Sequence, residues 1–360
     1  MKRIHAIDAL RGLALVGIVL VNVQWFSGHA VHPDPGHDRW GLDGVTTFLL
    51  HALVDGKFYT LFALLFGASF SLTLQRSGTR LAGRRLLSLL VLGSLHATLL
   101  WFGDILSLYA IAAIPLYALL RAPHAFRWAL GLLASPALLG GLLLLVPMDT
   151  ISGGHGPATL LPAFGGGDLP ALLQANLAFL GQRWLLALVS GRLPRLLGTF
   201  LLGAWLLRHR PHPTPSQRRL LISIAVVSNL ALAGLADTAV LPPSPRGFVR
   251  DVLSCIALPS GALAYVVLLG PWLTRRGRVV RALEHAGRLS LTHYLGQSLV
   301  LAAVFYGVGL GGWAQLGATE SAGVGLLLVT TQIAVSGPLL RRVRVGPAER
   351  LLRALDRRRA

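Results

Sequence analysis

The chain has 360 residues, of which 54% are hydrophobic and only 13% are charged, and its formal net charge is +19. Soluble domains carry about 25% charged residues. The composition therefore excludes a soluble enzyme or binding module and predicts a membrane protein with several spans. A single cysteine, Cys255, excludes an intrachain disulfide framework and a cysteine-rich metal site.

The distribution of the basic residues accounts for the high charge without a nucleic-acid partner. Most Lys and Arg residues lie in short segments that fall on one side of the membrane once the apolar runs are taken as spans. Such an excess marks the cytoplasmic side, so we expect cytoplasmic N- and C-termini and no bound nucleic acid. The first apolar run resembles a signal peptide, but Asp8 and Arg11 interrupt it and no small-residue cleavage site follows. We expect a retained first helix.

In chain order, the apolar runs are long enough to cross about 30 Å of hydrocarbon as helices. We therefore predict an all-α fold in which residues 1–360 form one transmembrane domain with about ten spans. Membrane lipid is then a partner, and the sequence leaves open whether two copies form a homodimer. The predicted spans cover residues 9–26, 58–75, 86–102, 104–120, 128–147, 195–208, 220–240, 251–273, 289–307 and 321–340.

The longer segments between and after the spans differ in composition. Residues 27–57 and 148–194 are predicted outer loops, and residues 341–360 are a predicted basic cytoplasmic tail. Within the tail, residues 348–359 have the pattern of a short basic amphipathic helix.

Residues 171–194 are apolar enough to count as a further span. Counting them would move the basic loop 208–219 to the outer side, against the charge rule. Polar residues, among them Gln174, Asn176 and Arg183, also interrupt the run. We therefore expect an interfacial or re-entrant helix on the outer side, with a further span as the alternative.

Asp8, Arg11 and Asn22 form a polar stripe in the first predicted helix. Asp8 and Arg11 are three positions apart and can neutralise each other, and Asn22 lies about three turns further along the same face. A guanidinium within a span costs roughly 2.5–3.5 kcal/mol at mid-depth on insertion scales, so the stripe favours a polar site inside the protein. The alternative is a salt bridge and an amide contact that only hold helices together.

Two other polar groups have simpler interpretations when each is considered alone. His96 lies in the third predicted span, where a lone histidine is more often a packing residue, and Asp104 can cap the following helix. Asp55 and Lys57 flank Gly56 before the second span, where an aromatic belt with a snorkelling lysine is expected.

Residues 287–298 bring polar side chains into the opening turns of the ninth span. His293 and Gln297 are one turn apart and share a face. This spacing predicts either a lined cavity or hydrogen-bonded helix packing.

The first outer loop holds His29, His32 and His37. Their irregular spacing and the neighbouring prolines favour a hydrated loop over a metal site. No metal is therefore expected.

Several stretches together carry a family resemblance. They are Ile7 to Gly12 with Val21 and Asn22, Gly56 to Tyr59 with Leu65 to Gly67, Arg84 to Leu86 with His96, Gly103 to Leu106 with Tyr109, Gly287 to Ser298 and Gly346 to Arg350. As a set they resemble the YeiB family of bacterial membrane proteins, a domain of unknown function. The resemblance implies a multi-pass protein of the bacterial inner membrane. His293 departs from the family, in which Asn is common at that position.

The YeiB family is similar in turn to the transmembrane acyltransferases, which include heparan-glucosaminide acetyltransferase and the acyltransferase-3 enzymes. Those enzymes use cytoplasmic acyl-CoA as co-substrate and modify an acceptor, often a sugar, on the far side of the membrane. In acyltransferase-3 enzymes an Arg is followed eleven positions later by a catalytic His, whereas Asn22 follows Arg11 here. The heparan-glucosaminide type also has Asn there and places its histidine in the outer loop, where His37 is the nearest counterpart.

This resemblance implies acyl transfer to an envelope glycan or a similar acceptor. His37, or alternatively His96, would deprotonate the acceptor. Arg11, paired with Asp8, or Asn22 would stabilise the oxyanion. Topology and lipid headgroups are an equally good explanation for any single inner arginine. The residues implied in binding acyl-CoA are Arg84, Arg85, Arg288, His293 and Gln297.

Two other functions stay open. The first is a permease for a small metabolite or a lipid-linked precursor, although no inverted repeat and no matching pair of broken helices is evident. The second is a non-catalytic membrane protein that has kept the acyltransferase scaffold.

Overall fold

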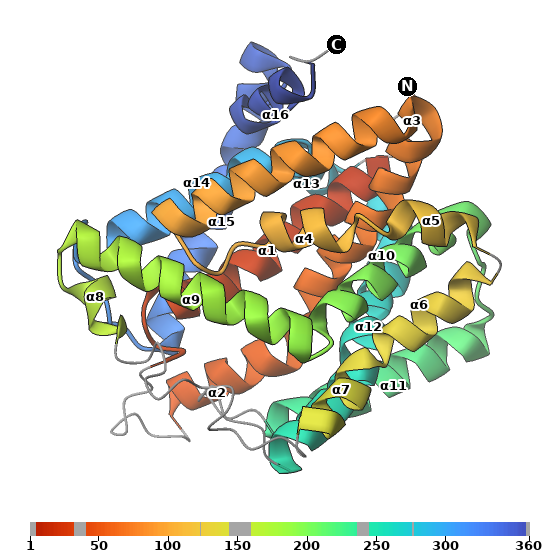
Figure 1. Cartoon of the computed structure of the whole chain (residues 1–360), viewed down its shortest axis with the longest axis horizontal. Helices are drawn as coiled ribbons and strands as arrows, with labels where there is room; N and C mark the ends of the chain where they lie inside the picture. The colour runs from red at the N-terminus through yellow and green to blue at the C-terminus, as the bar shows by residue number, and fades with distance from the viewer. Residues whose placement is uncertain are drawn as a thin grey trace.

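The computed structural model describes residues 5–31, 41–122, 124–143, 160–235, 245–275 and 277–357. These residues form helices and connecting turns, and none of them is in a strand. Figure 1 shows the helices packed into one bundle, with the N- and C-termini at the same end. The prediction of an all-α fold is confirmed.

The helices coincide with the predicted spans, with several breaks. The long elements before residue 190 are α1 (His5–Phe26), α3 (Lys57–Leu99) and α9 (Leu169–Val189), and between them lie the shorter α4 (Leu106–Ala112), α5 (Leu116–Arg121), α6 (Ala125–Leu133), α7 (Ser135–Leu143) and α8 (Pro162–Gly165). The second half contains α10 (Arg192–His209), α11 (Pro215–Gly234), α12 (Pro245–Leu273), α14 (Ser290–Phe305) and α15 (Ala318–Val343).

The structure supports a membrane protein with several spans. Five helical segments of the described chain are long and apolar enough to cross a membrane, and the bent pair α6–α7 makes a sixth. The two predicted spans 58–75 and 86–102 are the two arms of α3, because Gly78 has non-helical backbone angles (φ 74°, ψ 177°) at the bend between them. The other predicted spans correspond to α4 with α5, α10, α11 and α14, which are shorter, broken or more polar.

Helix α9 is one of the five segments long and apolar enough to span. Its position as an interfacial helix therefore stays a prediction, with a span as the alternative. In Figure 1, α9 runs alongside the bundle from α8 to the start of α10.

Several helices lie where the sequence predicted loops or a tail, among them α8 in the second outer loop. Helix α2 (Leu42–Leu49) continues into the π-helix η1 (Leu50–Val54) within the first predicted outer loop. Helix α13 (Arg278–Arg288) occupies a predicted inner loop, and α16 (Pro347–Arg357) is the amphipathic helix expected in the tail. Both α13 and α16 lie at the end of the molecule that holds the termini (Figure 1), which we call the inner end because the charge distribution predicts it to be cytoplasmic.

Helix α1 packs closely on α13 at the inner end. The two backbones meet at Gly12 and Gly287: a Cβ atom at Gly12 would overlap the carbonyl oxygen of Leu283, and one at Gly287 would overlap that of Asp8. Glycine is therefore required at both positions for the helices to approach this closely, as is common where membrane helices cross.

We predict that Gly287→Ala destabilises the fold by about 1–3 kcal/mol, because the added methyl group overpacks a rigid backbone contact. Thermal unfolding of the detergent-purified protein measures the effect as a lower midpoint. Gly181→Ala in α9 is the matched control, since nothing lies within 4 Å of a Cβ atom there, and alanine favours a helix over glycine. An unchanged midpoint for Gly287→Ala would contradict the packing of α1 on α13.

Candidate functional site

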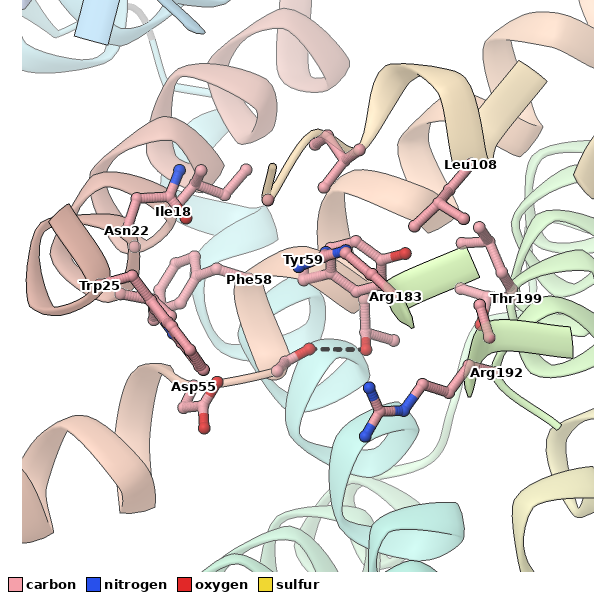
Figure 2. Close-up of a pocket in the computed structure, with 18 of the residues that line it drawn as sticks. Ile18, Asn22, Trp25, Asp55, Phe58, Tyr59, Leu108, Arg183, Arg192 and Thr199 are labelled. Carbon is pink, nitrogen blue, oxygen red and sulfur yellow. Dashed lines mark hydrogen bonds between the residues drawn. The ribbon is translucent and has the colours of Figure 1, made fainter. Parts of the chain in front are cut away.

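A cavity of about 270 Å³ lies at the end of the molecule opposite the termini, where α1 ends and where α3 and α10 begin. We call this end the outer end. Figure 2 shows Asn22 and Trp25 of α1 on one side of the cavity and Arg183, Arg192 and Thr199 of α9 and α10 on the other.

The cavity has an aromatic and apolar side and a basic side. Ile18, Trp25 and Phe58 contribute the apolar part from α1 and α3. Arg183 near the end of α9 and Arg192 and Arg195 in the first turn of α10 contribute the basic part. The lining is completed by Gly17, Val21, Asn22, Val54, Asp55, Gly56, Tyr59, Thr60, Trp101, Gly103, Ile105, Leu108, Ala187, Leu193, Leu196 and Thr199.

The turn between α9 and α10 fixes the position of the arginines. Gly191 has a left-handed backbone (φ 75°), and a Cβ atom there would lie 2.6 Å from the backbone of Ser135, so only glycine fits. The Ser135 hydroxyl donates to the Gly191 carbonyl at 2.8 Å. Arg195 donates from Nη1 to the Ser254 hydroxyl at 2.9 Å. Three distant segments therefore hold the basic side together.

A second cavity of about 210 Å³ shares Asp55, Gly56, Arg192 and Arg195 with the first. It adds Arg250 and Asp251 from α12. Asp55 accepts a hydrogen bond from His51 Nδ1 at 3.3 Å. Arginines therefore outnumber carboxylates across the two adjoining cavities.

Among the predicted site residues, Asn22 is the one that lines the larger cavity. Asp8 and Arg11 form the ion pair that their spacing predicts, with Nη1 of Arg11 3.1 Å from Oδ1 of Asp8. Arg11 also donates to the hydroxyl of Ser69 in α3. Arg11 and Asn22 are eleven residues apart on α1, which is about 16 Å along the axis at 1.5 Å per residue. The structure thus separates the polar stripe into an inner ion pair and an outer amide.

His96 and Asp104 form a buried pair at the outer end of α3. Nδ1 of His96 donates to Oδ1 of Asp104 at 3.0 Å, and both side chains are almost fully buried. The Tyr294 hydroxyl donates to the same Asp104 oxygen at 3.4 Å. The backbone N–H of Ser107 donates to Oδ2 at 2.8 Å, so Asp104 does cap the next helix. Nε2 of His96 has no hydrogen-bond partner in the described structure.

His293 and Gln297 face α15. Nε2 of His293 lies 2.7 Å from the Ser336 hydroxyl, and Gln297 donates from Nε2 to Oε1 of Gln332 at 2.9 Å. Gln332 in turn donates to the His293 carbonyl at 3.2 Å. The two predicted residues therefore hold α14 against α15, and they do not line the larger cavity.

At the inner end, Glu349 fastens α16 to the start of α14. One carboxylate oxygen accepts from the backbone N–H groups of Leu291 and Thr292 at 2.8 and 3.1 Å, and the other accepts from the Thr292 hydroxyl. This negative charge at a helix N-terminus is favourable. The tail helix is therefore docked on the bundle.

The predicted acyl-CoA-binding arginines Arg84 and Arg85 lie beside this docked helix, on α3. Arg85 is close enough to Asp356 of α16 and to Arg11 of α1 for electrostatic interaction. Arg288 ends α13. Burial lowers the pKa of His285 from its ordinary value, and Arg288 beside it lowers that pKa further. His285 therefore adds little to the positive charge of this surface at neutral pH.

His37 and His32 lie outside the described residues. Among the residues that the structure does describe, no three His, Cys, Asp or Glu side chains gather in a group able to hold a metal ion.

Arg183, Arg192 and Arg195 were not among the residues predicted for the site. Their positions in the sequence could have indicated a functional role. Each lies within or next to an apolar helix, where an unpaired guanidinium is energetically unfavourable. That cost becomes a functional indication once the three side chains are seen to converge on one cavity.

Comparison with known proteins identifies the family. Residues 204–359 match the family described as "Protein of unknown function (DUF418)". The chain is 30% identical over 392 aligned positions to the uncharacterized protein YeiB of Escherichia coli, covering 100% of this chain and 98% of YeiB. The chain belongs to the YeiB-like DUF418 family.

A second relative is similar over almost the same extent. The uncharacterized protein YxaH of Bacillus subtilis is 26% identical over 390 positions, covering 98% of this chain and 94% of YxaH. No solved structure matches the chain. The DUF418 match includes α14, α15 and α16, whereas all of the cavity lining precedes residue 204.

We predict that Asp104→Asn destabilises the fold by about 1–3 kcal/mol, since asparagine has one acceptor oxygen for two buried N–H donors, His96 Nδ1 and Ser107 N. Thermal unfolding in detergent measures this. Ser107→Ala is the control: it keeps the backbone donor and removes a buried hydroxyl that has no partner in the described structure, so its midpoint should not fall. Equal midpoints for Asp104→Asn and the wild type would refute the assigned hydrogen bonds.

Proposed function

We propose that this protein is a multi-pass acyltransferase of the bacterial inner membrane, which moves an acyl group from cytoplasmic acyl-CoA to an envelope acceptor. The observation that carries the proposal is the His96–Asp104 pair. Asp104 fixes the imidazole through Nδ1 and leaves Nε2 without a partner among the described residues. A carboxylate-oriented histidine with a free ring nitrogen is the arrangement that general-base catalysis needs.

The pair adjoins the cavity through the turn that follows α3. Trp101, Gly103 and Ile105 of this turn line the cavity, and Asp104 belongs to the same turn. Asn22 contributes its amide from α1 across the cavity and has no hydrogen-bond partner among the described residues. Its N–H group is therefore able to donate to a developing oxyanion.

The chemistry follows from these positions. Nε2 of His96 takes the proton of the acceptor hydroxyl or amine as that atom attacks the thioester carbonyl. Asn22 donates to the oxyanion of the tetrahedral intermediate. When the intermediate collapses, the C–S bond breaks and the CoA sulfur leaves as a thiol with the proton from His96. The products are the acylated acceptor and free CoA, and His96 is neutral again.

The donor would enter at the inner end. Arg84, Arg85 and Arg288 lie there, and guanidinium groups suit the phosphates of acyl-CoA. Arg11, with its partner Asp8, lies on the inner part of α1, the helix that carries Asn22 at its outer end. The thioester must cover the remaining distance along α1, about 16 Å from Arg11 to Asn22.

A permease for a small metabolite or a lipid-linked precursor is the second candidate. The observation in its favour is that Nε2 of His96 is enclosed, while the basic cavity beside it has room for a ligand. Catalysis requires the turn around Gly103 to move so that the ring reaches the cavity. Transport does not require this movement.

We predict that His96→Gln lowers acyl transfer by about 100- to 10,000-fold, the usual contribution of a general base. Glutamine keeps an N–H donor toward Asp104 but cannot accept a proton, so stability should stay near that of the wild type. The measurement is transfer of labelled acetyl groups from acetyl-CoA to an envelope extract by proteoliposomes, with saturable acetyl-CoA binding measured in parallel.

His212→Gln, a change at an exposed histidine in the 210–214 connection, is the control and should transfer at the wild-type rate. An Arg85→Gln variant should weaken acetyl-CoA binding. Absence of saturable acetyl-CoA binding to the wild type would remove the enzyme hypothesis. Uptake of solutes by the same vesicles without CoA would favour the permease instead.

A further inference from the structure

We propose that the outer cavity is a binding site for a phosphate group carried by an amphiphile, with Arg183, Arg192 and Arg195 holding the phosphate. The inference concerns binding alone and stands without acyl transfer. Only the role of the bound molecule as acyl acceptor rests on the function proposed above. A sugar carried on a lipid phosphate could bind in this cavity and also serve as the acyl acceptor.

The three guanidinium groups are close together and lack carboxylate partners. None of them forms an ion pair within 4 Å among the described residues. All three are close enough to Tyr59, on the cavity wall, for electrostatic interaction. Nε of Arg183 is buried without a hydrogen-bond partner in the described structure. Buried donors are normally satisfied, so this N–H group is available to an acceptor oxygen of a ligand.

The nearby carboxylates do not neutralise the site. Asp55 lines the cavity, but its carboxylate is half exposed and accepts from His51. Asp251 lies in the adjoining cavity, close enough to influence Arg192 and Arg195 but not paired with them. Arg250 lines the same adjoining cavity, so its positive charge offsets the negative charge of Asp251. The larger cavity therefore keeps an excess of positive charge.

A phosphate group has the charge and the several acceptor oxygens that three guanidinium groups can bind. The planar guanidinium forms two parallel hydrogen bonds to phosphate oxygens, and three such groups can satisfy several oxygens at once. The first turn of α10 also lines the cavity, and the positive end of its helix dipole adds to the attraction.

The cavity wall opposite the arginines is apolar, which favours an amphiphilic ligand. Ile18, Trp25 and Phe58 form an apolar surface across the cavity from Arg192 (Figure 2), and Trp101 is a further aromatic lining residue. Such a surface suits the hydrocarbon or ring portion of a ligand whose charged head reaches the basic side. A lipid headgroup or a free phosphate ester would share this chemistry.

The test uses the full chain purified in detergent, without any acyl donor. One arm titrates inorganic phosphate by calorimetry. The other arm counts bound phosphatidate by native mass spectrometry, with phosphatidylcholine as the neutral comparison. We expect one saturable site, and we expect Arg192→Gln and Arg183→Gln each to weaken it by roughly tenfold, the loss of one charge-assisted contact.

Arg192 is exposed, so its substitution should leave the thermal unfolding midpoint unchanged. Arg219→Gln, which removes an exposed charge from α11 away from the cavity, is the control and should bind like the wild type. Saturable binding of phosphatidate supports the proposal, whereas saturable binding of inorganic phosphate alone supports the arginine site and overturns the amphiphile as its ligand. No saturable binding of either probe, or equal binding by the wild type and both cavity variants, overturns it.

Discussion

The arrangement of the outer end depends on one buried carboxylate. Asp104 accepts hydrogen bonds from His96 on α3, from the backbone of Ser107 at the start of α4 and from Tyr294 on α14. A buried charge is tolerated only when its oxygens are satisfied, so these three segments must meet in this geometry. The turn from Trp101 to Ile105 is held in place as a result, and that turn is one wall of the outer cavity.

The arginines at the two ends of the molecule differ in their partners. At the inner end the charge of Arg11 is compensated by Asp8, and its guanidinium also donates to the Ser69 hydroxyl. A structural role is enough to explain its position. At the outer end, Arg183, Arg192 and Arg195 gather on one cavity without an ion pair among the described residues. The three positive charges repel each other, and a bound anion would offset this electrostatic repulsion. The second arrangement is the one that indicates a ligand.

Local patterns in the sequence determined much of the fold but only part of the site. Apolar run length was enough to locate α1, both arms of α3, α12 and α15, and the spacing of Asp8 and Arg11 was enough to predict their ion pair. The docking of α13 on α1 could not be predicted, because it depends on a close approach of Gly12 to Gly287 across some 275 residues of chain. The pairing of His96 with Asp104 was missed because each residue had a satisfactory explanation alone. The convergence of α1, α9 and α10 on one cavity is likewise a tertiary arrangement that no local pattern encodes.

The distance between the two basic regions constrains any reaction at this protein. The inner arginines lie beside the docked tail helix, and Asn22 with the basic cavity lies about three turns of α1 further out. A donor held by its phosphates at the inner end can react only if its acyl end extends through the bundle. An acceptor bound by the outer arginines would lie at the outer end of the bundle, next to the turn that carries Asp104. Asp104 orients the imidazole of His96, and a movement of the Trp101–Gly103 part of this turn would open the ring to both substrates while Asp104 stays in place. Phosphate binding on the outer side would therefore place the acceptor, while the His96–Asp104 pair would supply the chemistry.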